Sequence, residues 1–394
     1  MLRTLAVANY RSLRDLRVPL GRLTLITGPN GSGKSSVYRA LRLLADTAYG
    51  GVVRSLAREG GLPSVLWAGP EQFSAAMRRG EQPVEGTRRN KPVNLRLGFA
   101  GETPEDFGYA IDVGMPVPIP GGSLFDHDPE IKVETVWSGP VLRPSAELAR
   151  RHNALLETRG DTGRWAAVER MLPPYASMLA EFVDPRTAPE MLALREQIRG
   201  WRFYDHFRTD AEAPARWPQV GTRTPVLGHD GADFAAAVAT IREVGDAQAL
   251  EAAVDDAFPG ASLEVRVQDG QFEVLMRQPG LLRPLRSAEL SDGTLRYLLW
   301  IAALLTPRPP PLLVLNEPEA SLHPDLLPAL ARLVGRAARE AQVIVVSHAS
   351  RLVAALEDLH DVDVRSVVLE KSLGETRILN LAADELPQWH WPAR

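Results

Sequence analysis

Residues 28–35 read Gly-Pro-Asn-Gly-Ser-Gly-Lys-Ser, a spacing that matches G-x-x-x-x-G-K-[ST]. The segment before them, 22–27, alternates as a strand does, and the segment after them, 34–47, has apolar residues at helical spacing. Such a loop lets backbone N–H groups and a helix N-terminus surround phosphate oxygens. We expect Lys34 to contact the β- and γ-phosphates of a nucleotide and Ser35 to bind Mg²⁺. A turn without a ligand would not require Lys-Ser directly after its last glycine.

Polar residues also follow two apolar strands near the carboxyl end of the sequence. The strand at 312–315 is followed by Asn316 and Glu317, and the strand at 343–346 is followed by His348. Glu317 stands where a general base would activate water, and His348 could hydrogen-bond a γ-phosphate. Asn316 occupies a position where nucleotide hydrolases place a metal-orienting aspartate, and its amide brings no negative charge. We therefore expect weaker metal affinity. The alternatives are a surface glutamate and a structural histidine.

A third motif, Leu290-Ser-Asp-Gly-Thr-Leu-Arg296, opens a predicted helix. Ser291 is a natural N-cap, and that role alone would account for it. The functional interpretation is that Ser291, the Gly293 backbone and the helix dipole bind the γ-phosphate of a nucleotide held by another subunit.

The elements that must position these residues follow from the hydrophobic pattern. Alternation within 93–137 predicts an antiparallel sheet, and from about 145 to 258 the pattern turns helical around an irregular segment, 201–217. From 294 onward, helices alternate with buried strands, which argues for a parallel α/β sheet. We expect three parts: an amino-terminal lobe with the glycine-rich loop and antiparallel β subdomain, a helical insert lobe, and a carboxy-terminal α/β part. These cover 1–140, 141–290 and 291–394.

Together the motifs resemble the ABC-type P-loop ATPases, with Walker A at 28–35, the signature motif at 290–294, Walker B at 312–317, a D-loop at 320–324 and a switch histidine at 348. Within that superfamily, Asn9-Tyr-Arg-Ser-Leu13 and Asn316-Glu-Pro-Glu-Ala-Ser-Leu-His-Pro324 are similar to motifs of the RecF, chromosome-maintenance (SMC) head and OLD branch. The resemblance implies an ABC-ATPase head with a mixed sheet core, an antiparallel β subdomain and a helical signature lobe. It implies ATP and Mg²⁺ as cofactors and a head-to-tail dimer formed on ATP. The implied nucleotide-binding residues are Arg11, Asn30, Gly31, Ser32, Gly33, Lys34, Ser35, Ser36, Ser291 and Gly293; the metal-site residues are Ser35 and Asn316; the catalytic residues are Glu317 and His348.

Spacing separates the branches of this superfamily. Between Lys34 and Ser291 lie far more residues than transporter subunits place there, and the chain has no cysteine and no long heptads. We therefore expect a compact head without coiled-coil arms. Only 46 residues follow His348, too few for the Toprim nuclease domain of OLD proteins. The Q-loop glutamine of the family has no counterpart between Gln82 and Gln197; Glu134 could substitute, although a solvated strand residue is the simpler interpretation.

The composition of the chain limits the metals, membranes and nucleic acids that it could bind. The 394 residues carry a formal net charge of −4 and no cysteine, which excludes disulfides and thiolate metal sites. The longest apolar run is too short to span a bilayer, so we expect a cytoplasmic protein without membrane contact. DNA would need a local patch, and the best candidate is a basic stretch, although a charged run of this kind is usually just solvated. Its residues are Arg78, Arg79, Arg88, Arg89, Lys91 and Arg96.

The sequence thus predicts an ATPase that dimerises on ATP and acts in DNA repair or maintenance, or in defence against phage. The alternative is a slow or hydrolysis-deficient ATP-dependent switch that gates a separately encoded effector protein, which Asn316 favours. The aromatic and arginine residues of segment 201–217 favour a packed loop over nucleic-acid stacking.

Overall fold

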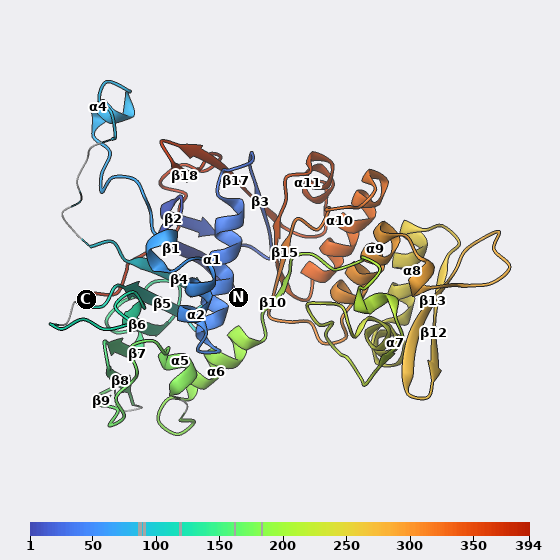
Figure 1. The fold of residues 1–394 in the computed structure, drawn as a ribbon, viewed down its shortest axis with the longest axis horizontal. Coiled ribbons are helices and arrows are strands. Elements are labelled where there is room, and N and C mark those ends of the chain that lie inside the picture. The colour runs from blue at the N-terminus through green and yellow to red at the C-terminus, as the bar shows by residue number, and fades with distance from the viewer. Residues whose placement is uncertain (86–88, 90–91, 118–119, 161–162, 183) are drawn as a thin grey trace. The chain divides into compact units, whose positions relative to one another are not determined.

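The computed structural model describes residues 1–85, 89, 92–117, 120–160, 163–182 and 184–394. The chain forms two compact units, each assembled from separate stretches of sequence (Figure 1). Unit 1 comprises 1–21, 28–200 and 367–394, and unit 2 comprises 22–27 and 201–366. The three-part division of the sequence cuts the chain differently and stays a prediction.

Unit 1 is built on an antiparallel sheet of eight strands in the order β2-β1-β4-β5-β6-β7-β8-β9. Alternating apolar residues form its core, and Leu5, Val7 and Phe99 are fully buried. The strands are β1 (Leu2–Tyr10), β2 (Leu13–Pro19), β4 (Leu95–Gly101), β5 (Phe107–Gly114), β6 (Glu130–Ser138), β7 (Glu147–His152), β8 (Leu155–Arg159) and β9 (Trp165–Ala167).

Helix α1 (Lys34–Thr47) is the longest helix of unit 1. It buries Val37, Leu41 and Leu44 along one face, as their spacing predicts. A hairpin of β17 (Val364–Ser372) and β18 (Glu375–Ile378) pairs Leu369 with Ile378. The other helices of the unit are α2 (Val52–Arg58), α3 (Leu62–Val65), α4 (Ala75–Arg78), α5 (Met178–Glu181) and α6 (Pro189–Arg199).

Unit 2 is built on parallel strands in the order β10-β15-β16-β3. The apolar runs of β15 and β16 are buried throughout, as expected for a parallel sheet covered on both faces. The α/β class predicted from the sequence is confirmed. The strands are β3 (Leu23–Thr27), β10 (Arg202–Tyr204), β15 (Leu312–Asn316) and β16 (Gln342–Val346).

Helix α9 (Asp292–Leu304) lies in the core of unit 2, and every residue from Leu295 to Leu304 is buried. A helix that is buried on all sides packs inside a domain rather than on its surface. The other helices are α7 (Phe234–Val244), α8 (Ala247–Ala257), α10 (Leu327–Ala338) and α11 (Ser350–Glu357), with 3-10 turns η1 (Pro214–Arg216), η2 (Ser287–Glu289) and η3 (Pro324–Leu326). A small antiparallel sheet completes the unit: β11 (Gln219–Val220), β12 (Ser262–Gln268), β13 (Gln271–Arg277) and β14 (Leu285–Arg286).

The prediction that the pattern turns helical from about residue 145 was wrong for the first part of that stretch. Residues 147–167 form β7, β8 and β9, which extend the antiparallel sheet. In β7 the inward positions are Ala149 and Arg151, so the buried face of the strand carries an arginine instead of a second apolar residue. The usual hydrophobic alternation is therefore missing from the sequence.

Arg151 compensates for its burial with an ion pair to Glu134 on β6. Both side chains are fully buried, and Arg151 Nη1 lies 2.9 Å from Glu134 Oε2. Glu134 also accepts hydrogen bonds from the Tyr109 hydroxyl at 2.6 Å, Ser177 Oγ at 2.5 Å and Met178 N at 2.8 Å. Burial, together with the Glu134 carboxylate, raises the pKa of Tyr109 well above its usual value. Glu134 is therefore neither solvated nor free to replace the Q-loop glutamine; it belongs to the core of unit 1.

Replacing Arg151 with methionine should lower the free energy of unfolding by about 3–5 kcal/mol, because it leaves the Glu134 carboxylate buried without its cation. Adding Glu134→Leu should recover much of that loss. Arg170→Met is the control: Arg170 pairs with Glu181 but is 62% exposed, so the expected cost is about 1 kcal/mol or less. Urea unfolding measures all three. Equal costs for Arg151→Met and Arg170→Met would contradict the buried-pair assignment.

No helix in the described part of the chain combines the length and the apolar character needed to cross a bilayer.

Candidate functional site

The glycine-rich loop, residues 28–35, follows β3 directly in the chain and ends at the second residue of α1. Gly28 has a φ of +143° and Gly33 a φ of +107°, both outside the range that side-chain-bearing residues favour. A Cβ on Gly28 would overlap the Leu369 carbonyl oxygen, and one on Gly33 would overlap Thr376 Oγ1. Both positions therefore require glycine for conformation and for space.

Thr376 on β18 holds the loop in place, and sequence reasoning did not single it out. Its hydroxyl donates to the Ser32 carbonyl at 2.7 Å and lies 2.8 Å from Ser12 Oγ, and its backbone N–H donates to the Ser12 carbonyl at 2.8 Å. A threonine in a short strand carries no local signal for this role. Only the fold brings residues 12, 32 and 376 together.

Lys34 is buried, with 5% of its surface exposed, and lies within the curve of the loop. Its Nζ donates to the carbonyls of Gly28 at 2.6 Å and Pro29 at 3.0 Å. Ser32 Oγ is buried and has no hydrogen-bond partner among the residues that the structure describes. Buried polar groups are normally paired, so an orphaned hydroxyl beside a lysine fits a loop that accepts a phosphate.

The remaining predicted residues of the loop differ in exposure. Asn30, Gly31 and Ser35 are exposed, and Ser36 is partly buried, its N–H donating to the Gly33 carbonyl at 2.9 Å. Ser35, in the first turn of α1, therefore has its side chain open to a ligand such as Mg²⁺.

Arg11 lies in the tight turn between β1 and β2, with a φ of +52°. Its Nη2 donates to Glu59 Oε2 at 2.6 Å, and its guanidinium lies over the Tyr10 ring at 5.6 Å. Arg11 Nε is buried without a hydrogen-bond partner in the described part of the chain. The nucleotide contact predicted for Arg11 would have to share this cation with Glu59, and it stays a prediction.

At the carboxyl edge of the unit 2 sheet, Glu317 and His348 meet. Glu317 follows β15 with a φ of +49°, and its N–H donates to the Val346 carbonyl at 2.8 Å. His348 Nδ1 lies 3.5 Å from Glu317 Oε1. Both side chains are about half exposed, 50% for His348 and 42% for Glu317. The structure thus brings together the two residues predicted to be catalytic.

Asn316 is the last residue of β15, in register with Val346 of β16. Its Oδ1 is buried and finds no hydrogen-bond partner within the described residues. An amide oxygen in this state is a free acceptor, which suits a metal-bound water as donor. The position therefore fits the metal-side role predicted for Asn316, although it supplies no charge.

Glu319 is a further functional residue that the sequence analysis did not single out. It is 8% exposed, and its Oε1 accepts hydrogen bonds from Ser347 Oγ at 2.7 Å, His348 N at 3.1 Å and Ala349 N at 3.3 Å. The same oxygen lies 3.5 Å from His348 Nδ1. Glu319 therefore fixes the loop that carries His348 and acts as a positioning residue. Its position within the motif 316–324 was the feature of the sequence that could have identified it.

Glu319→Ala should leave three donors without their acceptor and lower the free energy of unfolding by about 1–3 kcal/mol. Hydrogen exchange followed by mass spectrometry should show faster exchange at the His348 and Ala349 amides. Glu319→Gln keeps an oxygen acceptor and should exchange more slowly than Glu319→Ala. Glu317→Ala, whose side chain accepts no hydrogen bond from these amides, is the control and should leave their exchange unchanged. Unchanged exchange in Glu319→Ala would contradict the positioning role.

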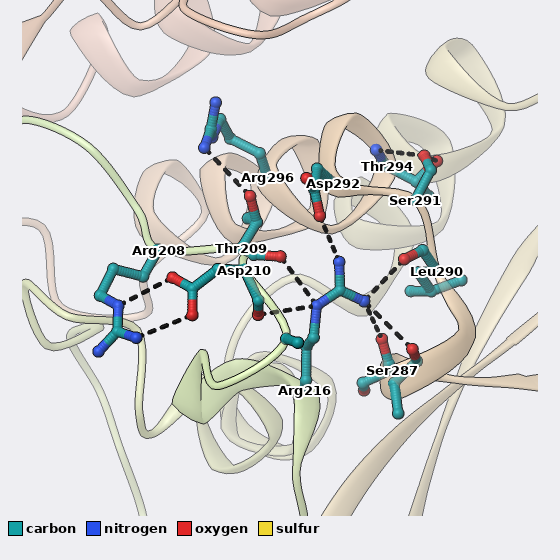
Figure 2. A network of polar contacts seen from close by, with 12 residues as sticks. Arg208, Thr209, Asp210, Arg216, Ser287, Leu290, Ser291, Asp292, Thr294 and Arg296 are labelled. Atoms are coloured by element: carbon teal, nitrogen blue, oxygen red, sulfur yellow. Dashed lines mark hydrogen bonds and ion pairs between the residues drawn. The ribbon is translucent and has the colours of Figure 1, made fainter.

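The signature segment forms the N-terminus of α9 (Figure 2). Ser291 is the N-cap: its Oγ accepts a hydrogen bond from Thr294 N at 3.2 Å and lies 2.8 Å from Thr294 Oγ1. Ser291 and Asp292 are exposed, so the capping role does not bury the motif. A Cβ on Gly293 would lie 3.4 Å from the Ser321 carbonyl oxygen, which places the D-loop against the first turn of α9.

Arg296, one turn further along α9, ties the same two segments together. It is buried, and it donates to the Ala320 carbonyl at 2.9 Å and to Thr209 Oγ1 at 3.1 Å. Burial lowers the pKa of Arg296. Within unit 2, the D-loop, the signature helix and the segment 201–217 therefore form one hydrogen-bonded assembly.

Three of the four described residues of the basic stretch predicted to contact DNA are already paired in the structure. Arg79 Nε lies 2.6 Å from Glu81 Oε1, and Arg96 Nε lies 3.0 Å from Asp112 Oδ2. Arg89 donates to the carbonyls of Trp67 and Gly69. Arg78 ends helix α4 and is exposed. Arg88 and Lys91 lie outside the described residues. DNA contact through this stretch stays a prediction.

Segment 201–217 is mainly a packed loop, as the sequence favoured. Tyr204, Phe207 and Arg216 are buried, and Tyr204 and Phe207 pack against Trp300 of α9. Trp217 is the exception at 51% exposure. The buried aromatic residues of segment 201–217 therefore pack in the core of unit 2 and do not form a surface on which nucleic-acid bases could stack.

In the described part of the chain, no cluster of three or more His, Asp or Glu side chains is arranged to bind a metal ion by itself.

The family described as AAA domain, putative AbiEii toxin, Type IV TA system matches residues 23–354 of the chain. An OLD nuclease of Thermus scotoductus (strain ATCC 700910 / SA-01) is 52% identical over 44 residues. That match covers 11% of this chain and only 8% of the nuclease, so the two share one segment rather than their whole length.

Two solved structures share the fold over nearly the full chain. A structure of an SMC head bound to the C-winged helix domain of ScpA has a TM-score of 0.54 at 13% identity, covering 97% of this chain and 98% of that one. The SMC head of Pyrococcus furiosus with an extended coiled coil, bound to the C-terminal domain of ScpA, has a TM-score of 0.53 at 14% identity, covering 97% and 96%. These similarities support the predicted ABC-ATPase head fold.

Proposed function

The chain belongs to the AAA-domain family described as putative AbiEii toxin of a type IV TA system, and on this premise we propose that it binds and hydrolyses ATP. The resemblance to P-loop ATPases of the RecF, SMC-head and OLD branch, first seen in the motifs, agrees with this family. The proposal covers the ATPase activity, the dimer that forms on ATP and the biological setting.

One observation carries the proposal: Glu317 and His348 lie 3.5 Å apart at the carboxyl edge of β15 and β16. In parallel α/β sheets, ligands bind outside this edge. The strand β3 belongs to the same sheet, and the glycine-rich loop follows its last residue directly in the chain. A base, a histidine and a phosphate-binding loop therefore follow strands of one sheet.

We assign the roles residue by residue. Lys34 and the loop from Asn30 to Gly33 bind the phosphates, with Ser36 and Arg11 in support. Ser35 and Asn316 hold Mg²⁺, which when bound would neutralise charge on the β- and γ-phosphates. Glu317 accepts the proton of the attacking water, and His348 donates a hydrogen bond to the γ-phosphate.

Ser291 and Gly293 complete the proposed site from a second copy of the chain. They lie at the N-terminus of α9, where Ser291 and Asp292 are exposed, and the first backbone N–H groups of a helix have no partner within the helix. This position supports an anion contact. Binding of ATP would then join two copies head to tail, and hydrolysis would separate them.

The biological setting we propose is DNA maintenance or defence against phage, in the cytoplasm. The family description, which refers to a toxin–antitoxin system, and the short match to an OLD nuclease support it. The test is ATP turnover with and without duplex and single-stranded DNA over a range of salt concentrations. Stimulation that weakens with salt supports a DNA-linked ATPase. Turnover that DNA never alters counts against the DNA setting.

A second function has its own supporting observation. Asn316 leaves the metal side of the site without the usual carboxylate, which favours slow hydrolysis. The chain would then act as an ATP-dependent switch that gates a separately encoded effector protein. ATP binding without measurable turnover, together with a stoichiometric co-purifying protein, would favour this function.

Lys34→Ala should abolish tight ATP binding, because it removes the main side-chain counter-charge to the β- and γ-phosphates. Isothermal titration calorimetry with ATP measures the affinity. Lys132→Ala is the control, since Lys132 lies on β6, outside the loop, and pairs with Glu130 of the same strand. Unchanged ATP affinity in Lys34→Ala would refute the assignment of the loop.

Glu317→Gln should bind ATP and accumulate as a dimer, because the glutamine keeps the size of the side chain but cannot accept the proton. Adding Ser291→Arg should return the protein to a monomer in saturating ATP, because it places bulk at the contact with the second copy. Light scattering with ATP measures the mass. A Glu317→Gln protein that stays monomeric, or a double variant that stays dimeric, would exclude the ATP-bridged dimer.

A further inference from the structure

The buried side chain of Arg216 lies beneath the signature segment (Figure 2). Its side chain is only 9% exposed. Its Nη1 donates to the carbonyls of Leu290 at 2.7 Å, Ala288 at 3.2 Å and Ser287 at 3.3 Å. Its Nε donates to the carbonyls of Thr209 at 2.8 Å and Asp210 at 3.1 Å. One guanidinium thus joins the loop before α9 to the segment 201–217.

The bond to Leu290 sets the direction of the next N–H group. A trans peptide is planar, so its C=O and N–H point in opposite directions. Because the Leu290 carbonyl points at Arg216, the Ser291 N–H of the same peptide points away from it. Ser291 is exposed, so this donor is turned out of the buried side of the loop. The orientation suits an anion that approaches from outside.

Arg216 also pairs with the one acidic residue of the motif. Its Nη2 lies 2.5 Å from Asp292 Oδ1, and the Asp292 side chain is 65% exposed. A carboxylate in the first turn of a helix stabilises the helix but repels a phosphate at the same N-terminus. A glycine at position 292 would carry no negative charge. In this chain the Arg216 guanidinium offsets the charge of Asp292.

We propose that Arg216 is the positioning residue of the signature motif: it orients the Ser291 N–H and neutralises Asp292, so that the N-terminus of α9 can receive the γ-phosphate of ATP bound to a second copy. This rests on the ATP-bridged dimer proposed above. Arg216 does not touch the nucleotide in this account; it acts through Ser291 and Asp292.

The test uses the full chain carrying Glu317→Gln, and it follows dimer formation in ATP by light scattering. Arg216→Met should weaken the dimer about tenfold, because the first turn of α9 regains an uncompensated negative charge. Adding Asp292→Asn should recover part of that loss, because it removes the uncompensated charge, while the bonds from Arg216 to the carbonyls stay lost. ATP affinity of the monomer, measured by calorimetry, should stay within about twofold, because the phosphate-binding loop is unchanged.

Arg208→Met is the matched control. Arg208 lies in the same segment and also pairs with an aspartate, Asp210 at 2.8 Å, but it is 56% exposed. It should leave the dimer unchanged. The recovery by Asp292→Asn separates the two possible roles of Arg216, because loss of the bonds to the carbonyls alone would not be repaired by removing a charge.

Three outcomes decide the proposal. A dimer in Arg216→Met as stable as its parent, or no recovery on adding Asp292→Asn, would overturn the role of Arg216 while leaving the ATP-bridged dimer intact. A parent that never dimerises would overturn both. Should Arg216→Met fail to fold, Asp292→Asn alone decides, because freeing the guanidinium charge should strengthen the dimer about threefold. A weaker or unchanged dimer would then refute the proposal.

Discussion

The carboxyl edge of the parallel sheet in unit 2 is the constraint on which the rest of the site depends. The strands β15, β16 and β3 run in the same direction, so the residues that follow them all leave the sheet at one edge. Glu317 and His348 meet there although a whole helix, α10, separates them in sequence. The glycine-rich loop starts from the third strand. Neither strand alone could bring Glu317 and His348 together, because each strand supplies only the residues at its own end.

Buried charged residues hold the parts that the sheet alone does not fix. Glu319 binds the loop of His348, Arg296 binds the D-loop, and Arg216 binds the loop before α9. Each satisfies several backbone groups at once, which is what a buried charge needs in order to be tolerated. The arrangement is directional, since a hydrogen bond to a named carbonyl fixes a peptide in a way that apolar packing cannot. The two arginines and the glutamate therefore fix the position of the backbone segments that they contact.

Unit 1 uses the same principle for stability. The Glu134–Arg151 pair is buried within unit 1, where either charge without its partner would destabilise the fold. The arginines of this chain show that residue type alone does not predict how exposed a side chain is. Arginine is its usual cation, and the arginines range from fully buried, as at Arg151, to largely exposed, as at Arg170. The charge of the basic stretch at 78–96 is likewise reduced by partners within the fold, such as Asp112 for Arg96.

The sequence by itself determined the elements and the residue types at the strand ends. Local spacing specifies the turn from β3 into α1, the buried strands β15 and β16, and the N-cap Ser291, because each depends on neighbours within a few residues. Tertiary structure alone decided what depends on distant partners. Strand β7 was missed because its buried arginine makes sense only beside Glu134, and Thr376 gains its role only when β18 meets the loop at Ser32. The reach of Arg216 across 74 positions to Leu290 is of the same kind, since no local pattern records which carbonyls a guanidinium will find.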